Sequence, residues 1–199
     1  MTGRGLTVNI VRNIWSGKQA MALNVIELAS REECAFPDKH GKAPLHFAAE
    51  AGMDKVLMAL LVDKDVDVHP KTINGWTPLH HAAFKSHPST IKLLVDTGKA
   101  RVNSLTNEAF TPLHYAAAVL SLECCEALIL RRADVNAINS YNETPFDAVG
   151  TLVKRELLCK QKKAKVMAML EKENGQSGSD VQKRLSYTAV KRLSRAVRW

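Results

Sequence analysis

The stretch that decides the fold is Thr72-Ile-Asn-Gly-Trp-Thr-Pro-Leu-His-His-Ala-Ala83. Close copies of it begin at Asp38 and Thr106, and a weaker copy, in which Thr-Pro-Phe-Asp replaces Thr-Pro-Leu-His, begins at Asn139. The prolines of the four copies are 34, 34 and 33 residues apart: Pro44, Pro78, Pro112 and Pro145. A fixed period of this length predicts a repeat architecture, in which similar units stack and each unit packs on its neighbours.

Each copy has the pattern of a turn followed by a helix. Proline is favoured in the first turn of a helix, where its missing N–H has no partner to lose, and the threonines before Pro78, Pro112 and Pro145 can act as N-caps. Gly41 and Gly75 suit a turn that requires positive φ. A second apolar run follows about twelve residues after each of the first three prolines. Cys124 and Cys125 lie in this run, so we predict that they are core residues and not a redox or metal pair.

These motifs resemble the ankyrin repeat, whose signature is T-P-L-H-x-A at a period of about 33 residues. The resemblance implies an all-α fold: an ankyrin-repeat solenoid of stacked helix-turn-helix units with β-hairpin or loop fingers, plus a basic C-terminal tail. It implies four repeats over residues 37–173, the last of them atypical. It also implies that His46, His80 and His114 hold each helix start to the adjoining hairpin, which is a structural role and not metal ligation.

The two ends of the array depart from the pattern. Residues 1–36 have no T-P-L-H motif but contain apolar runs at 6–15 and 19–30, so we predict a degenerate N-terminal capping unit of two helices. In the last repeat the apolar positions come late, which predicts a first helix lengthened through about Cys159 and a closing helix over 162–173. For the left-handed corner after the second helix, we expect Gly98 in one repeat and the non-glycine residues Asp65 and Arg132 in the two others.

Composition points to a folded, non-enzymatic, non-secreted protein. The four cysteines lack zinc-ligand spacing, and we expect them to be reduced. The start of the chain lacks the apolar core of a secretory signal, so we expect a cytoplasmic location, with the nucleus as the alternative. None of the common nucleotide-binding or catalytic motifs occurs, so we expect no enzymatic activity and no cofactor.

Positive charge is concentrated at the C-terminal end. Residues 1–150 contain 15 Lys/Arg and 16 Asp/Glu, whereas residues 151–199 contain 13 and 4. Residues 174–180 have the composition of a flexible linker, and 181–199 have the pattern of a basic amphipathic helix. The partners that fit such a tail are an acidic protein, a calmodulin-like groove or an anionic membrane, with nucleic acid a weaker alternative, and a merely solvated tail is the competing interpretation. Ser186 and Ser194 follow Lys-Arg-Leu and are candidate phosphorylation sites.

The resemblance also implies where a protein partner binds, because ankyrin domains engage proteins with the concave surface formed by fingers and inner helices. The positions of this sequence that match are Lys39, His40, Lys42, Ile73, Asn74, Trp76, Phe84, Lys85, Asn107, Glu108 and Phe110. Trp76 and Phe110 are aromatic where core packing does not require it, which favours binding anchors. The competing interpretation is that the two rings shield neighbouring hairpins.

Overall fold

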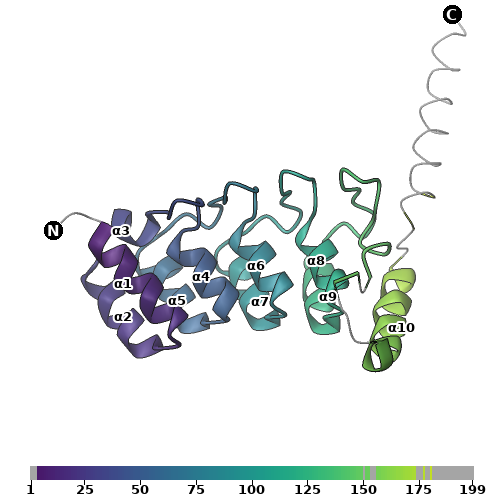
Figure 1. The fold of residues 1–199 in the computed structure, drawn as a ribbon, viewed down its shortest axis with the longest axis horizontal. Helices are drawn as coiled ribbons and strands as arrows, with labels where there is room; N and C mark the ends of the chain where they lie inside the picture. Colours follow the sequence, from purple (N-terminus) through teal and green to yellow (C-terminus); the bar gives the residue numbers. More distant parts are fainter. Residues whose placement is uncertain (1–3, 150, 153–155, 174–176, 178–179, 181–199) are drawn as a thin grey trace, which may run out of the picture.

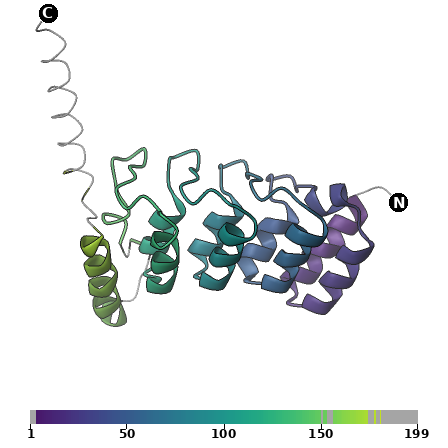
Figure 2. The same cartoon turned by 180° about the vertical axis from the view of Figure 1, so that it is seen from behind.

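The computed structural model describes residues 4–149, 151–152, 156–173, 177 and 180. Within them the chain forms a row of helix pairs from which loops, here called fingers, project to one side (Figure 1; Figure 2 shows the back). The first helices of the three regular repeats are α4 (Pro44–Ala51), α6 (Pro78–Phe84) and α8 (Pro112–Ala118). The second helices are α5 (Asp54–Met58), which continues as a π-helical turn (Ala59–Asp63), α7 (Pro88–Asp96) and α9 (Leu122–Ile129).

The core runs through the whole stack because each helix packs on its counterparts in the adjacent repeats. The paired alanines of α4, α6 and α8 are fully buried, which lets these helices approach closely. The second helices add one large apolar side chain per repeat at the equivalent position, and each is fully buried: Leu60, Leu94 and Leu128. Cys124 and Cys125 are also fully buried and unpaired, which confirms the prediction that they are core residues.

The N-terminal end of the stack is a helix pair followed by one further helical turn. Helices α1 (Arg4–Trp15) and α2 (Gln19–Leu28) lie where two helices were predicted, and they are joined through Gly17 at a φ of 70°. The short helix α3 (Arg31–Ala35) was not predicted; it is capped by Ser30, whose hydroxyl accepts the N–H of Glu33. The assignment of residues 1–36 as a capping unit stays a prediction.

The last repeat differs from the prediction. Residues 145–149 and 151–152 form turns and not a long first helix, and α10 (Glu156–Lys172) follows as a single helix that includes the predicted closing segment. The segment after Pro145 contains Val149 and Thr151, whose branched side chains disfavour a helix. Its backbone is instead held to the preceding repeat, since the N–H of Leu152 donates to the carbonyl of Ala118 at 3.2 Å. Val166 and Leu170 of α10 are fully buried and close the core.

The fingers are loops: the described residues contain no β-strand, so of the predicted β-hairpin or loop fingers the structure has the loop form. Each finger has a residue with positive φ at its tip, which includes the predicted Gly41 (74°) and Gly75 (77°). Single backbone hydrogen bonds link successive fingers, from Ile73 to His40 (3.0 Å), Asn107 to Asn74 (3.1 Å) and Ser140 to Glu108 (3.0 Å). The fingers therefore form one continuous rim, although one bond per pair is too few to make a strand.

The corner after each second helix is left-handed, but one of the residues there is not the predicted one. Asp65 and Arg132 have positive φ as predicted, whereas in the second repeat the left-handed residue is Lys99 (φ 59°) and not Gly98. Gly98 is required for a different reason: a Cβ atom there would lie 2.8 Å from the carbonyl oxygen of Leu94 and 2.9 Å from Cγ2 of Val68.

Replacing the strained corner residues by glycine is expected to stabilise the fold. Lys99→Gly and Arg132→Gly should each raise the free energy of unfolding by about 0.5–1 kcal/mol, because glycine adopts positive φ without the steric penalty of an L side chain. Lys92→Gly, an exposed position within α7, is the matched control and should lower stability by about 1 kcal/mol. Urea unfolding followed by circular dichroism measures all three. A loss of stability in the corner variants would contradict the strain assignment.

Candidate functional site

The finger side of the stack is positioned by three buried histidines with the same geometry. Nδ1 of His46, His80 and His114 accepts the backbone N–H of the residue before the helix, at 3.0, 3.1 and 3.1 Å. Nε2 of each ring lies 3.1 Å from a backbone carbonyl of the next finger, that of Trp76, Phe110 and Glu143 respectively. The structural role of the histidines is thereby confirmed. Thr77 and Thr111 lie at the N-cap as predicted, but their hydroxyls lie 2.8 Å from the histidine Nδ1.

These contacts require neutral rings. Nδ1 accepts a backbone hydrogen, and Nε2 must carry the proton that it donates to a carbonyl, so a second proton has no place. Burial lowers the pKa of His46 and of His80 to about 4, and it lowers the pKa of His114 as well. Both nitrogens of each ring are occupied within the fold. The rings therefore fix the fingers and do not present a binding group.

The predicted binding residues of the first two repeats gather around one depression of about 320 Å³, here called the central hollow. It lies between the first and second fingers and the helices beneath them, α4 and α6. Its wall includes six predicted residues: His40, Lys42, Ile73, Asn74, Trp76 and Phe84. Ile73 is 63% exposed and lines the hollow together with Trp76 and Phe84, so it presents apolar surface at the mouth of the hollow.

Glu50 organises the charges of the central hollow. Its carboxylate pairs with Lys42 and lies 3.3 Å from Nζ of Lys85 and 3.7 Å from Nδ1 of His81. Burial favours the protonated acid, but the hydrogen bond and charge of Lys42 outweigh it and hold the pKa of Glu50 below its usual value. Two cations thus share one anion, which leaves the hollow with a surplus of positive charge.

Aromatic side chains of the second and third repeats pack together in one cluster. The ring of Trp76 lies 4.3 Å from that of Tyr115, 5.0 Å from His81 and 5.7 Å from Phe84. Phe110 joins it at 5.4 Å from Tyr115. His81 and Tyr115 were missed from the sequence, although both occupy the variable x of T-P-L-H-x-A, the position that faces the fingers. Burial lowers the pKa of His81 to about 3 and raises that of Tyr115 to about 12, so both stay neutral.

Trp76 and Phe110 are half-buried, so each residue packs within the fold and also keeps part of its surface accessible. This partial burial is compatible with both interpretations of Trp76 and Phe110, as shields between neighbouring fingers and as anchors for a binding partner. The remaining predicted residues lie along the same rim. Asn107 donates from Nδ2 to the carbonyl of Ile73 at 2.8 Å, and Glu108 accepts from the hydroxyl of Tyr141 at 3.2 Å. Lys39 lies outside the central hollow, in a second depression beside α1.

Two predictions lie outside the described residues: the candidate phosphorylation sites Ser186 and Ser194, and the basic segment 181–199 that contains them. In the part of the chain that the structure describes, no helix is long and apolar enough to cross a membrane.

Comparison with known families agrees with this architecture. Residues 45–139 match the family model for ankyrin repeats, in three copies. The chain is therefore an ankyrin-repeat protein. Ankyrin repeats generally mediate protein–protein interaction and are typically non-enzymatic modules. A comparison with curated proteins found no match.

Proposed function

We propose that this chain is a scaffold or adaptor that binds a partner protein through the finger side of its repeats, with the central hollow as the principal contact, and that it acts in this way as a subunit of a larger assembly. The observation that carries the proposal is the exposed side chain of Ile73 beside the aromatic cluster. A large apolar residue at the mouth of a hollow exposes surface that a partner would bury. The half-buried ring of Trp76 behind it has the rigidity and area of a binding anchor.

Charge supports the same surface. Lys42 and Lys85 share the carboxylate of Glu50, and Asn74 and Asn107 provide amides along the rim. An apolar centre with polar groups at its border is the usual composition of a protein interface. A basic C-terminal tether to an anionic membrane or nucleic acid is the competing function, and it rests on the net charge of residues 151–199 and the amphipathic sequence pattern of 181–199.

The central hollow is tested by a substitution of the exposed Ile73 and by a double substitution of two half-buried aromatic residues. Ile73→Asp is expected to weaken partner binding by tenfold or more, since it places a carboxylate in an apolar contact, and to leave stability unchanged because the side chain is exposed. Trp76→Ala with Phe110→Ala should cost about 2 kcal/mol or more of binding, roughly thirtyfold in affinity. We expect this pair to lower stability too, since both rings pack on Tyr115.

The measurement is quantitative affinity enrichment from an extract of cells that express the chain, followed by titration of the enriched partner. Val62→Asp is the matched control, because Val62 is apolar and 55% exposed but lies on the π-helical turn, away from the fingers. A partner retained by Val62→Asp and lost by Ile73→Asp supports the proposal. Equal retention by both variants, with the fold intact, would move the binding surface elsewhere.

A further inference from the structure

A second depression, larger than the central hollow, lies beside α1. This α1 hollow has a volume of about 730 Å³, inside the range of about 300–1,000 Å³ in which proteins hold ligands. Its lining is mainly apolar and comes from α1, from the segment after α3 and from α4: Val8, Val11, Phe36, Pro37 and Phe47. Val8 is 53% and Phe36 41% exposed, so two of its walls are open apolar surface.

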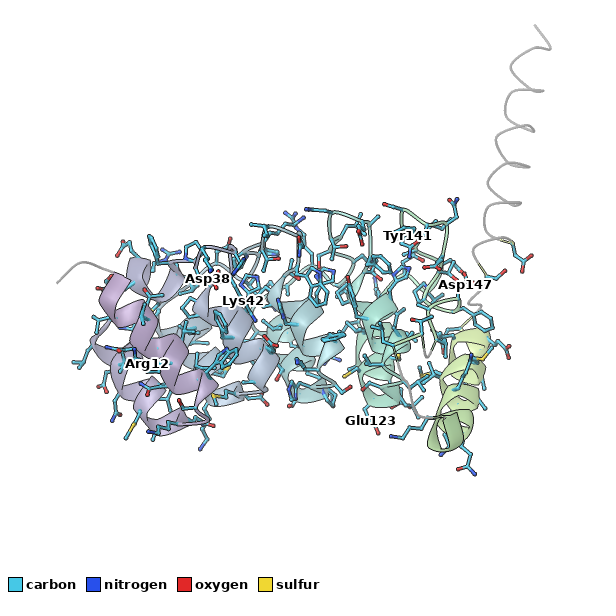
Figure 3. The ribbon with its side chains drawn as sticks, viewed as in Figure 1. Arg12, Asp38, Lys42, Glu123, Tyr141 and Asp147 are labelled. Carbon is cyan, nitrogen blue, oxygen red and sulfur yellow. The ribbon has the colours of Figure 1, made fainter. Side chains whose placement is uncertain are left out.

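The rim of the α1 hollow is basic. Arg12, Lys39 and Lys42 line it together with one acid, Asp38. Figure 3 shows Arg12 on α1, with Asp38 and Lys42 above it towards the fingers. The acid is engaged within the finger, where its Oδ1 accepts the backbone N–H groups of His40 (2.8 Å) and Lys42 (2.9 Å). Lys42 pairs with Glu50. Among the described residues, Arg12 and Lys39 have no ion-pair partner.

The α1 hollow adjoins the central hollow. Lys42 lines both, and its Nζ lies 4.2 Å from the centre of the Phe47 ring, so its side chain forms the wall between the two depressions. A chain that lies on the fingers at Ile73 therefore reaches the α1 hollow by passing one side chain.

We propose that the α1 hollow receives a bulky apolar side chain of the partner protein, and that acidic residues beside that side chain pair with Arg12 and Lys39. The apolar lining favours an apolar side chain of the partner. Arg12 and Lys39 favour acidic residues next to that side chain in the partner sequence. The inference rests on the proposed function, because the segment in the α1 hollow is part of the partner that occupies the central hollow. It adds the chemistry of that partner: an acidic segment with an apolar anchor.

Two other occupants fit less well. The chain's own segment 181–199 has six Lys/Arg and no acidic residue, so it has the same sign of charge as Arg12 and Lys39. An anionic membrane would suit the cations, but a membrane contact requires protruding apolar groups, whereas this apolar surface is recessed.

The test is a selection of random dodecapeptides displayed on phage against the full chain, followed by fluorescence-polarisation titration of the selected peptides. We expect enrichment of a bulky apolar residue next to Asp or Glu. Affinity should fall on the order of tenfold or more in Val8→Asp and in the double variant Arg12→Glu with Lys39→Glu, and the loss on charge reversal should shrink at high salt. All three residues are exposed, so folding should be retained; Lys92→Glu on α7 is the matched charge control.

Each remaining outcome overturns the inference. These outcomes are basic enriched peptides, no enriched peptide, or binding unaffected by Val8→Asp and the double charge reversal. Peptides that lose affinity in Ile73→Asp but not in Val8→Asp would leave the proposed function standing and refute this inference alone. Binding of the chain to phosphatidylserine vesicles that Val8→Asp abolishes, without peptide enrichment, would assign the α1 hollow to a membrane instead.

Discussion

Acidification from pH 7 to about 4.5 is expected to unfold the repeats. In the folded chain the pKa values of His46 and His80 are about 4 and that of His81 about 3, against an unperturbed value of 6.5. At a pH between the folded and unfolded pKa values, the unfolded state binds protons that the folded state cannot accept. The contribution of the histidines to the free energy of unfolding is therefore fully present above pH 6.5 and falls as the pH decreases toward 4. Each histidine contributes up to about 1.4 kcal/mol per pH unit in this window. Three such groups lose on the order of 10 kcal/mol, comparable to the whole stability of a domain.

The measurement is urea unfolding at a series of pH values, with the histidine ring signals followed by NMR. His80→Gln should lower stability at pH 7, since an amide fits the two contacts less well, and should also reduce the pH slope by about one proton. The carboxylates stabilised in the fold, such as Glu50, lose their contribution only at lower pH. A free energy of unfolding that stays constant from pH 7 to 5 would show that the rings are not held neutral.

The second large effect is expected in the core of the third repeat. Leu128→Ala should lower the free energy of unfolding by about 2–5 kcal/mol, because a fully buried leucine leaves a cavity between α9 and its neighbours. Cys124→Ala removes a smaller side chain from the same core and should cost less. Leu130→Ala is the control: this leucine is 80% exposed at the end of α9, and its loss should change stability by less than about 0.5 kcal/mol.

The thiols give an independent measure of the same packing. Burial raises the pKa of Cys124 to about 11 and raises that of Cys125 further, so neither thiolate is available at neutral pH. Alkylation of either cysteine should therefore follow unfolding of the repeat. Rapid labelling in the native protein, at a rate independent of denaturant, would contradict the buried position of Cys124.

The repeats could be predicted from the sequence because the residues that determine the structure of one repeat recur at equivalent positions in three repeats. Proline fixes each helix start, and histidine at the third helical position has one local and one neighbouring contact. The sequence could not locate the left-handed corner to a single residue, since Gly98 and Lys99 are adjacent and the glycine is required by the close approach of Leu94 and Val68. Glycine is needed at position 98 because of close packing, part of it against the preceding repeat, and the repeat period does not reveal contacts of that kind.

The candidate site was predictable in position but not in composition. Family positions located Ile73, Trp76 and Phe84, which do meet in the central hollow. His81 and Tyr115 were not predicted, because their ring contacts come from neighbouring repeats and the sequence of one repeat does not reveal them. The α1 hollow was missed entirely. Its lining combines α1, the segment after the unpredicted α3, and α4, which are far apart in the pattern that defines the repeats.

Asp147 stands in the fourth repeat where the first three repeats have histidine. One carboxylate oxygen of Asp147 accepts both the N–H and the hydroxyl of Thr144 at 2.8 Å. Asp147 therefore makes the same local contact that the histidine Nδ1 makes in the other repeats. An ionised carboxylate has no proton to donate to a following finger, and among the described residues none follows. The fourth repeat thus keeps the contact with its own Thr144, and Asp147→His would restore the N–H donor with which the histidines of the first three repeats reach the next finger.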